Sequence, residues 1–83
     1  MAEYTLIKPI GEGESKVEKV TIKEEFTGRD VETIGNAGGE GSAMIALVSA
    51  ATGLGKAKVL SMSAVDVKNI GEIAKPFFAG GEG

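Results

Sequence analysis

The sequence contains no cysteine and no histidine. These absences exclude disulfide bonds, thiol nucleophiles, metal sites built from Cys or His, and any catalytic scheme that uses an imidazole. Aromatic residues make up only 5% of the chain, so a core must be built mainly from Val, Ile, Leu, Met and Ala. Small secreted domains often depend on disulfide bonds, and the lack of cysteine therefore favours a cytoplasmic setting.

Clustered positive charge is also missing. The 83 residues carry 9 basic and 12 acidic side chains, and the formal net charge is −3. The closest basic pair is Lys56 and Lys58. Because nucleic acids and anionic membranes both select for a dense basic patch, we expect neither as a partner.

The segment 1–7 has no basic start and no long apolar stretch, so we do not expect a signal peptide.

The acidic side chains do not match a known catalytic or metal-binding pattern. Glu24 and Glu25 are adjacent, but neighbouring residues on a strand point to opposite faces. The spacing of acidic residues over 30–40 does not fit a calcium loop. The glycine-rich segment 35–41 has Glu40 where a phosphate-binding loop needs its second glycine, and no lysine stands near Ser42. We therefore expect no enzymatic activity, no cofactor and no metal.

Charged and β-branched residues alternate near the N-terminus. The segments 5–10 and 16–24 predict two short strands, and the glycine-containing segment 11–15 between them favours a hairpin. Pro9 cannot donate a ladder hydrogen bond, so we place it at an edge or at the end of its strand. An isolated hairpin is marginally stable in water, and its apolar face must therefore rest on helices or on another chain.

Two helices are expected in the middle of the chain. Thr27 and Asp30 form the N-cap pattern of a short helix that must end at the glycine-rich segment 35–41. The segment 41–55 has no charged residue and predicts a largely apolar helix that Ser42 caps. This helix is either the central core helix or a helix whose second face meets another protein. A short turn or helix follows before residue 60.

The last helix begins with a second cap pattern, Ser63 followed by Asp66. Pro76 lacks an N–H group and clashes one turn back, so we expect the helix to end or kink near Ala74–Lys75. The two phenylalanines would then follow on a short tail with a different direction. Either one of them closes the core while the other faces outward, or both pack inside.

Together these segments predict an α+β fold with an N-terminal two-stranded β-hairpin followed by about three helices. We expect a single domain over 1–83, an ordered core over 4–78 and a flexible tail at 79–83. The apolar helix surface exceeds what one small domain can cover, which is typical of an interaction surface. The residues expected to bind a partner are Met44, Ile45, Val48, Phe77 and Phe78.

Several short motifs occur in a distinctive order. They are Lys8-Pro9-Ile10, the strand Val17 to Lys23, Thr27-Gly-Arg-Asp30-Val31, Thr52-Gly53-Leu54, Leu60-Ser-Met-Ser-Ala-Val-Asp66 and Phe77-Phe78. In this order, over about Tyr4 to Phe78, the chain resembles the small tail assembly chaperones of Mu-like contractile-tailed bacteriophages. Two segments depart from that pattern. Glu24-Glu25-Phe26 stands where the family often has a proline before the threonine, and 35–41 is unusually rich in glycine.

The resemblance implies a non-enzymatic viral chaperone in the bacterial host cytoplasm. Such a protein binds the phage tape-measure protein during tail assembly and is absent from the mature virion. The resemblance also implies that this chain is the short form of a pair, whose frameshifted longer form recruits the tail-tube protein. It fits a free phage and a prophage equally well, and it fits either a monomer or a homo-oligomer.

Two other interpretations remain open. The chain could be a structural or adaptor subunit that is retained in a phage-like particle and uses its hairpin for β-augmentation. It could also be a small antitoxin-like or regulatory domain, although the scattered lysines disfavour a DNA-binding form.

Overall fold

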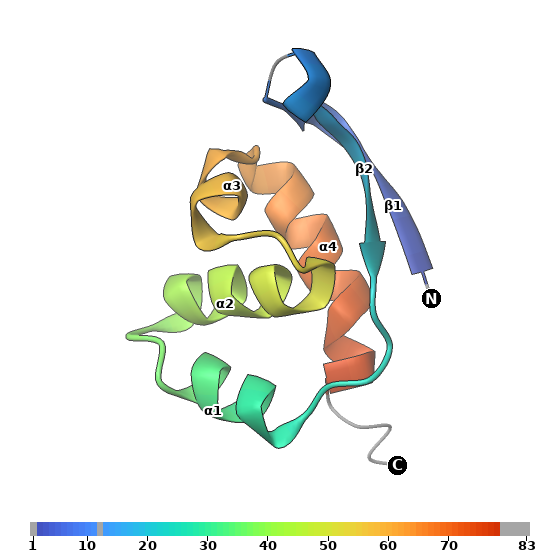
Figure 1. Cartoon of the computed structure of the whole chain (residues 1–83). Coiled ribbons are helices and arrows are strands. Elements are labelled where there is room, and N and C mark those ends of the chain that lie inside the picture. The colour runs from blue at the N-terminus through green and yellow to red at the C-terminus, as the bar shows by residue number, and fades with distance from the viewer. Residues whose placement is uncertain (1, 12, 79–83) are drawn as a thin grey trace.

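The structure is a computed structural model that describes residues 2–11 and 13–78. Its elements are β1 (Ala2–Ile10), a short 3-10 helix η1 (Gly13–Ser15), β2 (Val17–Ile22), α1 (Gly28–Gly35), α2 (Glu40–Thr52), α3 (Lys56–Ser61) and α4 (Ala64–Phe78). The hairpin lies along one side of the molecule and the helices lie on the other (Figure 1). The predicted α+β fold is confirmed, with four helices in the described part because 56–61 is also helical. The tail expected at 79–83 lies outside the described residues.

The two strands pair in an antiparallel hairpin with a large irregularity. Pairing runs from Ala2 opposite Ile22 to Thr5 opposite Lys19, and it resumes only at Ile10 opposite Val17. The segment 6–9 of β1 therefore faces a single residue of β2, which makes a wide bulge. Pro9 lies in this bulge, where the two strands are not paired. The N–H that proline lacks is therefore not needed for a hydrogen bond of the strand ladder.

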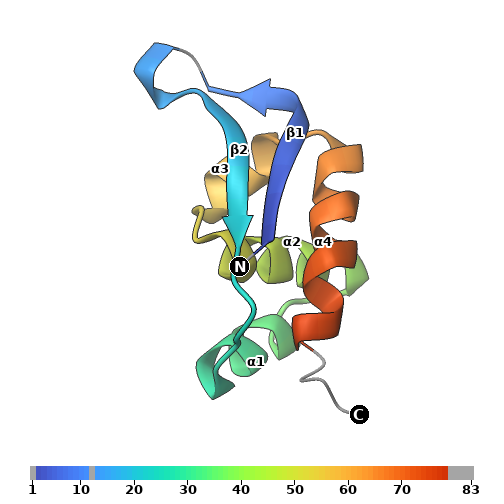
Figure 2. The same ribbon diagram turned by 90° about the vertical axis from the view of Figure 1, so that its right-hand side faces the viewer.

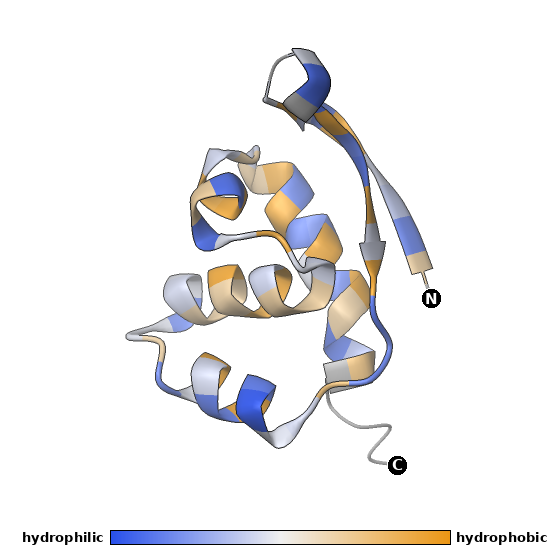
Figure 3. Ribbon diagram, in the orientation of Figure 1, coloured by the Kyte–Doolittle hydropathy of each residue, from blue (hydrophilic) through white to orange (hydrophobic). Residues whose placement is uncertain are grey.

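The core lies between the hairpin and the helices. Figure 3 shows hydrophobic residues along β2, α2 and α4, and Figure 2 shows β1 beside α4. Fully burying one aliphatic side chain stabilises the fold by about 1.5–3 kcal/mol. The buried apolar residues are Leu6, Ile10, Val20, Ile22, Leu47, Val48, Ala51, Val59, Met62, Val67, Ile70 and Ala74. One backbone hydrogen bond, from Lys23 N to Ala51 O at 2.9 Å, ties the end of β2 to α2.

The cap predicted for α1 is confirmed. The Asp30 N–H donates to Thr27 Oγ1 at 3.3 Å, and the Thr27 N–H donates to Asp30 Oδ2 at 3.0 Å. Lys23 Nζ lies 2.7 Å from the same carboxylate and links the hairpin to this helix. These interactions, with the hydrogen bond from Lys23 the strongest, lower the pKa of Asp30 below its ordinary value.

Helix α2 begins earlier than the sequence predicted. Its N-cap is Gly39 and its first residue is Glu40, so the prediction that Ser42 caps the helix is wrong. Glu40 lies in the first turn, where a carboxylate interacts favourably with the positive end of the helix dipole. The helix ends at Thr52, and Gly53 adopts a left-handed conformation with φ 78° at the C-cap.

Helix α4 runs through Pro76 to Phe78, so the expectation that it ends near Ala74–Lys75 is wrong, and the alternative of a kink there stays a prediction. Pro76 lies only two residues before the end of the helix, and its missing N–H removes a single hydrogen bond there. The proline φ is itself helical. Ala74 is fully buried, and Ile73 packs against the core, so tertiary contacts hold the last turns in place.

Candidate partner-binding surface

A buried carboxylate joins β1 to the start of α4. Asp66 has no exposed surface, and both of its oxygens accept hydrogen bonds. The backbone N–H groups of Ile7 and Lys8, which belong to the bulge, donate to it at 2.9 and 3.0 Å. The hydroxyl of Tyr4 donates at 2.7 Å and that of Ser63 at 3.1 Å. The carboxylate thus satisfies backbone donors that the bulge removes from the strand ladder.

The environment of Asp66 keeps this residue ionised. Burial by itself raises the pKa of the carboxyl group, but the hydrogen bonds from Ile7, Lys8, Tyr4 and Ser63 outweigh it and leave the pKa below its ordinary value. Burial also raises the pKa of the Tyr4 hydroxyl, which accepts a hydrogen bond from Asn69 Nδ2 at 2.9 Å. Because Asp66 is fully enclosed, we assign it a structural role.

Some large apolar side chains remain exposed in the described part of the chain. Ile7 is 68% exposed, Leu60 60%, Val65 55% and Val31 52%. The sequence did not predict that these residues are exposed. For Ile7, Leu60 and Val65, the signal that could have identified them is their position off the apolar stripe of their own strand or helix.

The residues that the sequence predicted for partner binding do not form a single surface in the structure. Val48 is fully buried in the core and has no surface to offer a partner. Met44 is half-buried and lies over Gly71 of α4, where its Cγ would be 3.5 Å from an added Cβ. Ile45 is half-buried and lines a groove on another side of α2. Phe77 is half-buried near the end of α4, and the side chain of Phe78 lies outside the described part.

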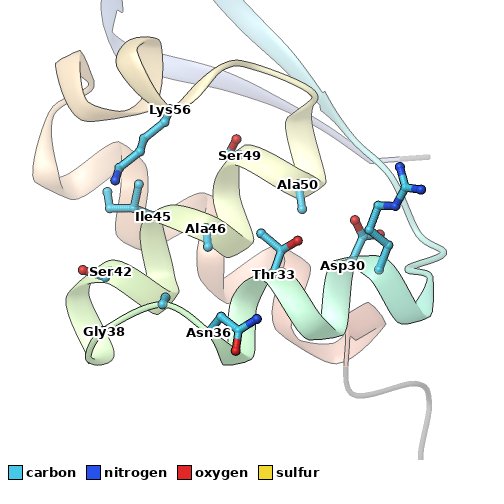
Figure 4. Close-up of a pocket in the computed structure, with 12 residues that line it drawn as sticks. Asp30, Thr33, Asn36, Gly38, Ser42, Ile45, Ala46, Ser49, Ala50 and Lys56 are labelled. Carbon is cyan, nitrogen blue, oxygen red and sulfur yellow. The ribbon is translucent and has the colours of Figure 1, made fainter.

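The groove that contains Ile45 runs between α1 and α2 and has a volume of about 520 Å³ (Figure 4). Ile45, Ala46 and Ala50 of α2 form its apolar floor, and Thr33 of α1 and Asn36 at the C-cap of α1 form a wall. These floor residues belong to α2, which has no charged residue after Glu40 and most of whose residues are only half-buried. The groove floor is therefore apolar surface that the rest of the described structure leaves uncovered.

Charged side chains stand at the ends of this groove. Lys56 lies near Ile45, and Asp30 lies at the opposite end (Figure 4). Arg29, the chain neighbour of Asp30, also lines the groove. Asp30 is paired with Lys23, whereas neither Arg29 nor Lys56 forms an ion pair within residues 2–11 and 13–78. The groove therefore presents two cations whose charge the described structure leaves unmatched.

No helix of the described part is long and apolar enough to cross a membrane. Three or more acidic side chains do not gather anywhere in residues 2–11 and 13–78 in a way that could hold a metal ion.

A small α+β domain with an open apolar groove and exposed apolar side chains has the features of a protein-binding module. The family model for phage tail assembly chaperone proteins, described as E, or 41 or 14, matches residues 3–79. The chain therefore belongs to this family of phage tail assembly chaperones, and the resemblance drawn from its motifs is confirmed. No significant match was found among curated proteins or among solved structures.

Proposed function

We propose that this chaperone binds the phage tape-measure protein while the tail is assembled and leaves before the virion is complete. Membership of the tail assembly chaperone family supports the general role. The observation that supports binding of the tape-measure protein is the open groove on α2, with Ile45 in its floor. A long helical tape measure exposes apolar seams before the tube closes around it, and a helix of this kind binds in a groove through its apolar face.

Ile45 contacts the partner directly in the groove, and the half-buried Met44 and Phe77 make further contacts along α4. Phe78 is proposed as a contact from the sequence alone, because its side chain lies outside the described part of the chain. Val48 is left out because it is sealed in the core. In the same proposal, a frameshifted longer product carries the extension that recruits the tail-tube protein.

Co-purification with the tape-measure protein tests this function. The chaperone is co-expressed with a tagged tape-measure protein from the same phage, in the wild-type form and as Ile45→Glu. We expect wild type to co-purify and Ile45→Glu to lose about tenfold or more of the bound protein, since a charge would be buried at the contact. Leu60→Glu places the same charge on an exposed apolar position outside the groove and should bind normally.

The folding of each variant is checked by circular dichroism. If Ile45→Glu does not fold, Ala46→Gln replaces it, because this change fills the groove floor without adding charge. The proposal is wrong if wild type does not bind the tape measure, or if folded groove variants bind as well as wild type.

A second candidate function is a structural or adaptor subunit that is retained in the particle. It is favoured by the hairpin, because each strand has one edge without a strand neighbour in the described structure. Such an edge can receive an additional strand from another chain. The composition of purified particles distinguishes the two functions.

A further inference from the structure

We infer that the groove between α1 and α2 accepts an amphipathic helix whose apolar stripe is flanked by carboxylates, which pair with Arg29 and Lys56. This inference rests on the proposed function, and it names the chemistry of the partner segment that the groove selects.

The shape of the groove favours a helix as its occupant. Ala46 and Ala50 project little from the floor, so the backbone of a second helix can approach α2 closely. The 13 residues of α2 extend over about 20 Å, which corresponds to between three and four turns of a docked helix. Ile45 at one end of the floor provides an apolar ridge against which such a helix can pack.

Within the described residues, the groove has no buried and unpaired polar group of the kind that would orient a small polar ligand. A small-molecule site needs convergent polar groups that orient its ligand. Every buried side-chain nitrogen or oxygen in the described residues already has a hydrogen-bond partner. Ser49, which lines the groove, donates its hydroxyl hydrogen to Leu54 O at 2.7 Å.

The charge of the groove determines which charged residues can flank the apolar stripe of a bound helix. The chain as a whole is acidic, with a formal net charge of −3. The groove nevertheless contains Arg29 and Lys56 as exposed cations, while Asp30 is matched by Lys23 at 2.7 Å. Glu32 and Glu40, the exposed acids of α1 and α2, do not line it. A helix with carboxylates on both sides of its apolar stripe is the complementary partner.

The two cations lie at opposite ends of the groove. Lys56 begins α3 at one end of the groove, and Arg29 is in the first turn of α1 next to Asp30 at the other end. Carboxylates on separate turns of the bound helix can therefore meet both cations at once. A helix flanked by lysines would instead place like charges together, which costs affinity and slows association.

The test uses two synthetic amphipathic helical peptides of equal length with the same Leu/Ala stripe, one flanked by Glu and the other by Lys. Binding is measured by fluorescence anisotropy at low and at moderate salt. We expect wild type to bind the Glu-flanked peptide about tenfold more tightly, with a difference that shrinks as salt is added. The double variant Arg29→Glu/Lys56→Glu should lose or reverse this preference.

The matched control is Lys19→Glu/Lys68→Glu, which makes the same change in net charge at exposed positions that do not line the groove. This variant should keep the wild-type preference. The inference is overturned if wild type binds both peptides equally, or if the groove variant behaves like the control. A dimer, detected by analytical ultracentrifugation and abolished by the groove variant, would assign the groove to a second copy and would also overturn it.

Co-purification with the tape-measure protein separates this inference from the proposed function. If wild type binds the tape measure and Arg29→Glu/Lys56→Glu binds it equally well, the inference is wrong and the proposed function stands. If wild type does not bind the tape measure at all, the proposed function itself is wrong.

Discussion

At the scale of single residues, Asp66 connects parts of the chain that are far apart in sequence. Its cap interaction with Ser63 is local, so the sequence pattern predicted it. Its bonds to Tyr4, Ile7 and Lys8 span 58 to 62 positions and could not be predicted, because periodicity reports which face a residue occupies and not which strand it meets. The bulge that supplies these donors has no sequence signature beyond Pro9.

Replacing Asp66 by Asn should destabilise the protein by about 2–4 kcal/mol, since an amide cannot accept every hydrogen bond that the carboxylate accepts and one buried donor is left unpaired. Urea unfolding at neutral pH measures the change. Tyr4→Phe, which removes one donor and leaves both backbone donors paired, should cost about 1 kcal/mol. If Asp66→Asn unfolds at the same urea concentration as wild type, the structural role of this carboxylate is refuted.

The lowered pKa of Asp66 also predicts how stability depends on pH. The folded protein binds this proton less readily than the unfolded chain, so the contribution of the carboxylate is complete above the unfolded-state value of about 3.9. It is lost as the pH falls through the lower folded-state pKa. Acid should therefore reduce the stability of wild type more than that of Asp66→Asn. A difference between the two proteins that stays constant from neutral pH to pH values below the folded-state pKa would contradict the assignment.

At the scale of elements, the contact between α2 and α4 shows what propensity can predict and what it cannot. Gly71 lies within α4, where helix propensity disfavours glycine, and the structure places Met44 of α2 over it. The caps at Thr27 and Gly53 were predictable because their signals are local. The end of α4 was not, because tertiary contacts carry that helix past Pro76.

Gly71→Ala should stabilise the protein by about 0.5–1 kcal/mol. The added Cβ would lie 3.5 Å from Met44 Cγ, an ordinary contact with a flexible side chain, while the unfolded chain loses conformational freedom. Thermal or urea unfolding measures the effect. Gly53→Ala is the control and should destabilise by about 1 kcal/mol, because φ there is 78°. A loss of stability in Gly71→Ala would show that this contact is tighter than described.

At the scale of the whole molecule, the sequence predicted the architecture better than the surface. Alternating and helical patterns were enough for a hairpin followed by helices. The packing of these elements decides which apolar residues remain exposed to solvent. Val48 was expected at a partner surface and is sealed, whereas Ile7 and Val65 are exposed and were not selected. The groove between α1 and α2 exists only after the chain has folded, and its charges come from two separate helices, α1 and α3.

The central claim is that this chaperone acts transiently on the tape-measure protein. Quantitative mass spectrometry tests it most directly, by comparing tape-measure complexes isolated during tail assembly with purified complete virions. We expect the chaperone in the assembly complexes and its absence from the virions. Recovery of the protein from purified virions in a fixed ratio to the other tail proteins would contradict the claim and would identify a structural subunit.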